Sequence, residues 1–220
     1  MLSVIIVAAG SSRRMGLDKL LAPLAGSCVL AQTVQRFQEC PDVGEIILVC
    51  PAQRFAQLGI MASCNMMRVD GGSERHYSVQ AGLRALSDSS RHVAIHDGAR
   101  PLVTPQAISL CYQTAQETGA ATLARPATET IKRGTADHLV HESISRENLW
   151  FMETPQIFQT DLIQQAYREV EARDELVTDE VSALQLIGRA TTLVTSPCFN
   201  PKITYPADLT LAHTYLSAHD

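Results

Sequence analysis

The feature that most constrains the fold is a regular alternation of short apolar runs with helical segments. Runs rich in β-branched residues recur at 4–7, 45–49, 66–69, 92–95 and 120–123. Most segments between them carry apolar residues at helical spacing, as Val29, Val34 and Phe37 do in the first. Strands that alternate with helices form parallel sheets covered on both faces. The pattern therefore predicts an α/β fold, with a mostly parallel twisted sheet flanked by helices.

Length and composition favour a single domain. The chain has 220 residues, of which 45% are hydrophobic and 19% are charged. These fractions are ordinary for a globular enzyme, and a chain of this length buries a sizeable core without disulfides or structural metal. Together with the α/β pattern, they predict one Rossmann-like domain over 1–220.

The alternation is interrupted between Arg125 and Trp150. Residues 130–133 and 138–145 are predicted to form two strands joined by a polar turn at 134–137. Both strands are too polar to belong to the main core. We therefore expect a projecting β-hairpin arm over 126–150 that pairs with a second copy of the chain, which predicts a homodimer. The α/β pattern then returns, with helix starts at 160, 178 and 208.

Charge and cysteine patterns exclude several classes of protein. The net charge of −5 argues against binding nucleic acid through a general positive field. The six cysteines are scattered without a CxxC pair, which fits neither a zinc site nor a disulfide framework. The apolar run 1–7 precedes its positive charges, the reverse of a signal peptide, and no segment has the roughly 20 apolar residues of a membrane span. The sequence predicts a cytoplasmic protein with no membrane or nucleic-acid partner.

The most informative stretch follows the first strand and reads Ala8-Ala9-Gly10-Ser11-Ser12-Arg13-Arg14-Met15-Gly16. Small residues let backbone approach a ligand, and successive N–H groups bind phosphate oxygens. Arg13, Arg14 and Lys19 add the concentrated positive charge that triphosphate chemistry needs. The stretch lacks both the GxxxxGK[ST] spacing of a Walker A loop and the second glycine of GxGxxG, where Ser12 stands. The alternative interpretation is a strand-to-turn connection with solvated arginines.

Asp97 follows the apolar run 92–95, and in open parallel sheets ligands bind at the carboxyl ends of strands. A carboxylate beside a triphosphate is repelled unless a cation lies between them. Asp97 is therefore predicted to hold Mg²⁺ together with phosphate oxygens. The alternative is a capping carboxylate without a metal. We interpret His96 as a packed histidine, because an ionised phosphate needs no base to attack.

Several separated blocks of the chain carry further information when they are taken together. The first is the Ala-Ala-Gly-x-x-x-Arg-Met loop with a lysine a few residues on. The others follow in order at 70–75, 96–101, 130–132, 146–150, 154–156, 178–180 and 200–204. Together these blocks resemble the 2-C-methyl-D-erythritol 4-phosphate cytidylyltransferase family, and the resemblance covers nearly the whole chain. It implies transfer of CMP from CTP to 2-C-methyl-D-erythritol 4-phosphate, with Mg²⁺ as cofactor and release of diphosphate, in non-mevalonate isoprenoid synthesis.

The resemblance also implies roles for residues that bind the nucleotide. Charge that develops during an in-line displacement would be stabilised by Arg14, Lys19 and Lys202. The triphosphate and ribose would contact Ala8, Ala9, Gly10, Ser11, Arg13 and Asp97. The cytosine would be recognised by Gly72, Ser73 and Ser78, whose hydrogen-bonding groups separate cytosine from uracil. The alternative is an ordinary turn with Ser73 capping the next helix, and Arg75 is interpreted as a structural ion-pair partner.

A further set is implied to bind the acceptor phosphate or to line the cleft near it. These residues are Arg100, Thr130, Arg146, Thr154 and Thr178. An arginine grips a phosphate bidentately and orients it for attack. The alternative for Arg146 is a side chain that only decorates a strand, and Lys202 on its own would be taken for a solvated surface lysine.

Two rival functions remain open, and the chain departs from the family pattern in places. The nearer rival is ribitol 5-phosphate cytidylyltransferase, and the more distant one is a non-catalytic nucleotide-binding regulatory module. The family's lysine usually sits in a Pro-Lys-Gln context, whereas here Asp18 and Leu20 flank it. Ser12 stands where glycine is common, and Glu129 where aspartate is. None of these changes removes a cation, so we expect the chemistry to be retained, with effects on loop detail and acceptor fit.

Overall fold

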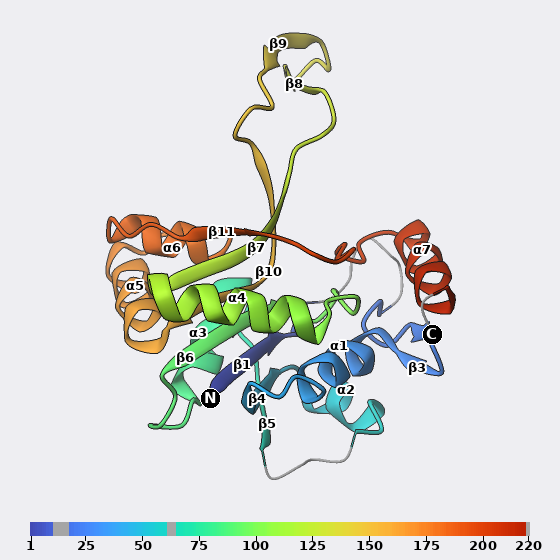
Figure 1. The fold of residues 1–220 in the computed structure, drawn as a ribbon, viewed down its shortest axis with the longest axis vertical. Helices are drawn as coiled ribbons and strands as arrows, with labels where there is room; N and C mark the ends of the chain where they lie inside the picture. Colours follow the sequence, from blue (N-terminus) through green and yellow to red (C-terminus); the bar gives the residue numbers. More distant parts are fainter. Residues whose placement is uncertain (11–17, 61–64, 219–220) are drawn as a thin grey trace.

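The computed structural model describes residues 1–10, 18–60 and 65–218 (Figure 1). Within them, one central sheet is built from β1 Leu2–Val7, β4 Val43–Val49, β5 Met66–Val69, β6 His92–Asp97, β7 Ala120–Pro126, β10 Trp150–Gln159 and β11 Thr192–Thr195. The strand order is β11-β7-β10-β6-β1-β4-β5. β10 runs antiparallel to its neighbours β6 and β7, whereas the remaining pairs of this sheet are parallel. The mixed, mostly parallel sheet confirms the predicted fold class.

The two faces of the sheet carry separate apolar clusters because successive side chains of a strand point to opposite faces. In β1, Val4 and Ile6 belong to one cluster and Ile5 to the other. Helices that pack on the first cluster are α1 Val29–Gln38, α2 Ala52–Gln57, α4 Pro105–Thr118 and α7 Pro206–Ser217. Helices that pack on the second are α3 Arg75–Arg84, α5 Thr160–Arg173 and α6 Glu180–Leu186. The described part of the chain includes no helix long and apolar enough to span a membrane.

Local signals in the sequence explain where α4 begins and ends. The Thr104 side chain accepts a hydrogen bond from the Ala107 N–H at 3.2 Å, and Pro105 occupies the first turn. This is the predicted start of the helix. Gly119 ends it with a φ of +84°, in the left-handed region that favours glycine. The helix therefore leads directly into β7.

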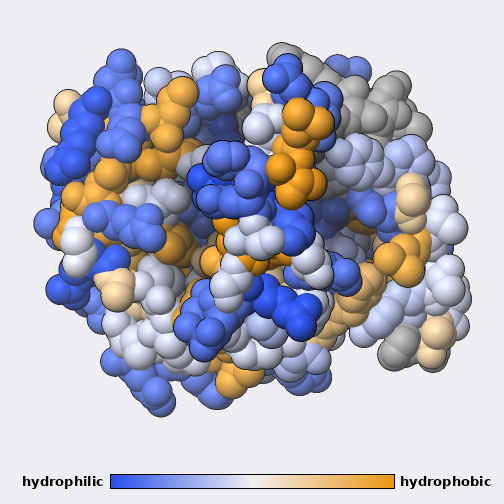
Figure 2. Space-filling model, turned by 90° about the horizontal axis from the view of Figure 1, so that it is seen from above, coloured by the Kyte–Doolittle hydropathy of each residue, from blue (hydrophilic) through white to orange (hydrophobic). Residues whose placement is uncertain are grey.

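A hairpin projects from the body of the molecule, as expected over 126–150 (Figure 1). It leaves from β7 and returns into β10, and its far end pairs β8 Ile131–Gly134 with β9 Val140–Ile144 in antiparallel register. Most of its side chains are exposed, including Leu139 at 67% and Val140 at 71%. From above, apolar side chains stand among strongly polar ones at the end from which the arm projects (Figure 2).

The sequence pattern missed several elements. These are α2, β10, β11 and the small hairpin of β2 Pro23–Leu24 with β3 Ser27–Cys28. β10 was missed because its buried stretch contains polar residues. Glu153, Thr154 and Gln156 are each less than 5% exposed and are held by hydrogen bonds. This polar strand lies between two apolar ones and supplies much of the support for the site described next.

Candidate active site

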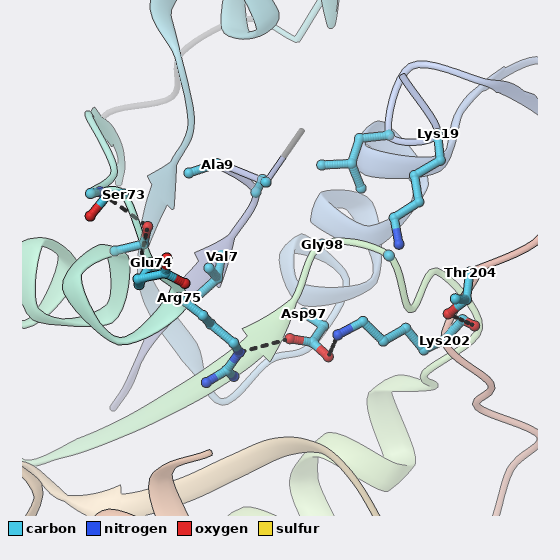
Figure 3. Close-up of a pocket in the computed structure, with 16 residues that line it drawn as sticks. Val7, Ala9, Lys19, Ser73, Glu74, Arg75, Asp97, Gly98, Lys202 and Thr204 are labelled. Atoms are coloured by element: carbon cyan, nitrogen blue, oxygen red, sulfur yellow. Dashed lines mark hydrogen bonds and ion pairs between the residues drawn. The ribbon is translucent and has the colours of Figure 1, made fainter. Parts of the chain in front are cut away.

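A cleft with a volume of about 650 Å³ opens at the carboxyl ends of β1 and β6 (Figure 3). Its lining includes the residues after β1, the turn that leads into α3, and the end of β6 with the residues that follow it, namely 8–10, 72–75 and 97–99. Lys19 and Lys202, which are 183 positions apart in the chain, also line it. This is the edge at which open α/β sheets bind ligands.

Asp97 is the anion around which the cations of the cleft are arranged. Lys202 Nζ lies 2.8 Å from Oδ2, Arg75 Nε 3.3 Å from Oδ1 and Arg100 Nε 3.6 Å from Oδ2. Burial opposes ionisation of this carboxyl, but Arg75, Lys202 and Arg100 outweigh it and hold the pKa of Asp97 well below its usual range. Asp97 is therefore ionised throughout the neutral range.

Arg75 is fixed from its other side by a fully buried carboxylate. Its Nη1 and Nη2 donate to the two oxygens of Glu180 at 2.6 and 3.0 Å, and the Tyr167 hydroxyl donates to Glu180 at 3.1 Å. Burial disfavours the charge of Arg75, but Glu180 and Asp97 raise its pKa above the ordinary value. Arg75 is thus an ion-pair partner, as its position in the sequence suggested.

His96 fixes the backbone of Asp97 through a directed chain of hydrogen bonds. The ring is fully buried, and burial lowers the pKa of His96 to about 3, so it is neutral. Nε2 lies 3.1 Å from the Arg100 carbonyl oxygen, which only accepts, so Nε2 carries the proton. Nδ1 therefore accepts from the Thr154 hydroxyl at 3.0 Å, and Thr154 Oγ1 accepts from the Asp97 N–H at 3.1 Å. These contacts agree with the interpretation of His96 as a packed residue.

The two lysines of the cleft are joined through the segment 200–204. Lys19 Nζ donates to the Ile203 carbonyl oxygen at 2.7 Å, and the Ile203 N–H donates to the Ala99 carbonyl at 2.8 Å. Asn200 anchors the start of the segment by donating to the Thr154 carbonyl at 2.8 Å. The chain contains only three lysines, at 19, 132 and 202. Two of the three therefore lie in this cleft.

Close packing explains the glycines at the opposite wall. A Cβ on Gly71 would lie 2.4 Å from Ala9 Cβ, and one on Gly72 would lie 2.3 Å from Tyr77 Cβ. The Ser78 hydroxyl accepts from the Gly72 N–H at 3.1 Å and donates to the Glu74 carbonyl at 3.2 Å. The alternative in which Ser73 caps α3 was wrong: the N-cap is Glu74, with no side-chain cap.

Comparison with known proteins identifies the family to which the chain belongs. The family described as 2-C-methyl-D-erythritol 4-phosphate cytidylyltransferase, IspD, matches residues 2–218. The chain belongs to this family.

Relatives at the level of sequence and structure agree with this assignment. The chain is 40% identical to the 2-C-methyl-D-erythritol 4-phosphate cytidylyltransferase of Symbiobacterium thermophilum, over 97% of this chain and 92% of that one. It is 39% identical to the enzyme of the same name from Alkaliphilus oremlandii, over 97% of this chain and 94% of that one. Its structure is similar to that of the 4-diphosphocytidyl-2C-methyl-D-erythritol synthase of Anaerococcus prevotii, with a TM-score of 0.85, 27% identity and coverage of 98% and 96%.

Some of the residues expected to bind the nucleotide line the cleft, and the others lie outside the described residues. Ala8, Ala9, Gly10, Lys19, Gly72, Ser73, Ser78, Asp97 and Lys202 line the cleft. Ser11, Arg13 and Arg14, like the departure at Ser12, lie outside the described residues. Glu74 and Thr204 line the cleft as well; both lie in blocks that carry the resemblance, at 70–75 and 200–204, but neither was assigned a role.

The expected acceptor residues lie around the cleft rather than in its described lining. Arg100 donates to the Asn200 carbonyl at 2.7 Å and to the Met152 carbonyl at 3.3 Å. Thr154 belongs to the hydrogen-bond chain under Asp97. Thr130 and Arg146 are exposed on the arm, where Arg146 donates to the Thr128 carbonyl. Thr178 is exposed beside the start of α6, with its hydroxyl 3.4 Å from that of Ser182. Their contacts with an acceptor stay a prediction.

Sequence reasoning missed Arg54 of α2. It is 9% exposed, and its guanidinium reaches the carbonyl oxygens that follow β1. A single arginine in a short polar helix carries no motif, so its position behind the cleft emerges only from the fold.

The electrostatics of Asp97 predict how stability depends on pH. In the unfolded chain this carboxyl titrates near its ordinary value of about 3.9, whereas in the folded protein its pKa is lower. The resulting stabilisation is present above about pH 4 and is lost as the pH falls further. In urea unfolding with EDTA, the stability of the wild type minus that of Asp97→Asn should be constant from about pH 6 to 8 and shrink below about pH 4. A difference that grows on acidification would contradict this account.

Proposed function

We propose that this chain transfers CMP from CTP to 2-C-methyl-D-erythritol 4-phosphate and releases diphosphate. The product is 4-diphosphocytidyl-2-C-methyl-D-erythritol, an intermediate of non-mevalonate isoprenoid synthesis. The observation that carries the proposal is the convergence of Lys19, Asp97 and Lys202 on one cleft in a member of this family. Two lysines and one buried carboxylate at the carboxyl edge of a sheet suit a triphosphate bound with a metal ion.

The reaction is an in-line displacement at the α-phosphorus of CTP. An oxygen of the acceptor phosphate forms a bond to that phosphorus, and the bond to the bridging α–β oxygen breaks. The electron pair of that bond leaves with diphosphate. The acceptor is already ionised, so no general base is required, and the neutral, buried His96 suits a site without one. Lys19, Lys202 and Arg14 would stabilise charge on the equatorial and leaving oxygens.

The buried carboxylate of Asp97 suits a magnesium ion shared with the substrate. Among the described residues there is no cluster of three or more His, Cys, Asp and Glu side chains arranged to hold a metal. Mg²⁺ typically uses one or two carboxylates and completes its shell with substrate phosphates and water. Asp97 would be that carboxylate, and the bound ion would neutralise charge on the triphosphate. The ionised carboxylate of Asp97 fits this mode of binding.

The turn at 71–73 is the proposed recognition element for cytosine. Gly72 brings backbone to the surface of the cleft, where its polar groups would face the edge of the base. Ser78 would contribute by holding the Gly72 N–H in place, because its hydroxyl accepts from that N–H and donates to the Glu74 carbonyl at the start of α3. Ser73 is exposed at the cleft and is available for a contact of its own.

The arm is the proposed dimer contact, and it would bring Thr130 and Arg146 to the acceptor of one of the two subunits. The arm exposes Leu139 and Val140 at its far end. Two neighbouring apolar side chains at an exposed tip are better accommodated against a partner than in water. Together with Arg100, Thr154 and Thr178, the arm residues would orient the acceptor phosphate.

The function is tested by diphosphate release from CTP and Mg²⁺, with 2-C-methyl-D-erythritol 4-phosphate and ribitol 5-phosphate offered in parallel. Release is expected with the first acceptor. Lys19→Ala and Lys202→Ala should each lower turnover at least about a hundredfold, as loss of one transition-state donor does. Lys132→Ala, which removes the remaining lysine, is the control and should keep wild-type turnover.

Other outcomes of this assay discriminate between functions. Release with ribitol 5-phosphate alone would identify the chain as the related cytidylyltransferase. Release with neither acceptor would favour a regulatory nucleotide-binding module. Near-normal turnover of either Lys19→Ala or Lys202→Ala would remove that lysine from the mechanism.

The dimer is tested by solution mass. Sedimentation of the wild type should give the mass of two chains. Leu139→Glu combined with Val140→Glu should shift it toward one chain, because burying two carboxylates at the contact is costly. Leu176→Glu changes a leucine that is 73% exposed outside the arm, and it should remain dimeric. A wild type with the mass of a single chain would rule out the proposed dimer.

A further inference from the structure

Arg54 contacts the chain on both sides of the segment 11–17. Before it, Nη1 donates to the Ala8 carbonyl oxygen and Nη2 to the Gly10 carbonyl oxygen at 3.1 Å. After it, Nε donates to Asp18 Oδ2 at 2.9 Å, and Nη2 lies 2.8 Å from the same oxygen. One guanidinium from α2 therefore joins the end of β1 to the residue that precedes Lys19.

The two carbonyl contacts orient the backbone that lines the cleft. In a planar trans peptide, the C=O and the following N–H point in opposite directions. Because Arg54 holds the Ala8 carbonyl, the Ala9 N–H lies on the side away from Arg54. Ala8, Ala9 and Gly10 all line the cleft. Arg54 thus acts from behind on the backbone whose N–H groups suit phosphate oxygens.

The Asp18 contact fixes the origin of the Lys19 side chain. Asp18 Oδ1 accepts from the Leu20 N–H at 3.2 Å, and the Asp18 carbonyl accepts from the Leu21 N–H at 3.0 Å. The same carboxylate is therefore bound to its own turn and to Arg54. Asp18 is one of the positions where this chain departs from the family pattern, and here its charge has a defined partner.

We propose that Arg54 is a positioning residue for the nucleotide, and that it sets the distance between the backbone at 8–10 and the ammonium of Lys19. This inference rests on the proposed function. Arg54 is 9% exposed and is absent from the described lining of the cleft, so it acts through Ala8, Gly10 and Asp18. A positioning role predicts that substitution of Arg54 weakens the binding of CTP but not of the acceptor. A purely structural role predicts a less stable protein whose folded form keeps its affinity for CTP and its kinetic constants.

The first experiment compares Arg54→Met with a control substitution at an exposed arginine, Arg173→Met. Arg173 also pairs with a carboxylate, Glu169 at 2.5 Å, and reaches a carbonyl oxygen, that of Leu186 at 3.4 Å, but it lies on α5. Arg54→Met should weaken CTP binding at least tenfold by calorimetry and leave the KM for the acceptor within twofold. Arg54→Lys should recover part of the loss. CTP affinity equal to that of Arg173→Met would overturn the proposal.

A second experiment covers the case in which Arg54→Met does not fold. Asp18 is 32% exposed, so Asp18→Asn removes its charge at little risk to folding. If Asp18 acts by placing Lys19, Asp18→Asn should lower kcat several-fold in the wild type and have no further effect in Lys19→Met. If Asp18→Asn lowered kcat by the same factor in the wild type and in Lys19→Met, the proposal would be overturned.

Failure of the proposed function is distinguishable from failure of this inference. In the first case the wild type itself transfers no CMP, and calorimetry with CTP still tests Arg54. In the second case the wild type is active, and the Arg54 and Asp18 variants match it.

Discussion

The ionised carboxylate of Asp97, with three cations around it, is the interaction on which the rest of the site depends. Lys202, Arg75 and Arg100 come from three different segments, and each meets this one buried anion. Every cation is also fixed from elsewhere or carried by an anchored segment: Arg75 by Glu180, Arg100 by two carbonyl oxygens, and Lys202 by the segment that Asn200 anchors. Without substrate, the positive charge is therefore already concentrated where a triphosphate with its metal ion would bind. Little reorganisation is needed at the moment of reaction, which is how electrostatic preorganisation speeds phosphoryl transfer.

Most of the fold could be predicted because apolar strands and amphipathic helices are visible in the sequence. The runs at 4–7, 45–49 and 92–95 became neighbouring or central parallel strands, and the capping pair Thr104-Pro105 marks the start of α4. β10 could not be predicted in the same way. Its buried residues Glu153, Thr154 and Gln156 are satisfied by partners far along the chain, such as Asn200 and the start of α6. Hydrophobic periodicity cannot identify polar side chains that are buried because a distant segment supplies their hydrogen-bond partners.

The same limit applies to the site. Lys19 and Asp97 could be singled out because each follows a strand in a recognisable block, and the fold brings them together. The role of Lys202 could be predicted only from the resemblance, since an isolated lysine is usually solvated. Arg54 carried no signal, although it holds the backbone at 8–10 and the carboxylate of Asp18. Residues that contact a ligand often belong to motifs that can be found in the sequence. Residues that support them from behind are identified only by their contacts in the folded structure.

The scarcity of lysine in this chain allows the central claim to be tested directly. Acetylation with a limiting reagent, followed by mass spectrometry of peptides, reports on Lys19, Lys132 and Lys202 separately, and these are all the lysines present. Lys132 lies on β8 in the arm and serves as the internal reference. If Lys19 and Lys202 jointly surround a metal-bound triphosphate, CTP with Mg²⁺ should protect both of them and leave Lys132 unchanged. Continued labelling of Lys19 and Lys202 at saturating CTP, at the rate seen without nucleotide, would contradict the account.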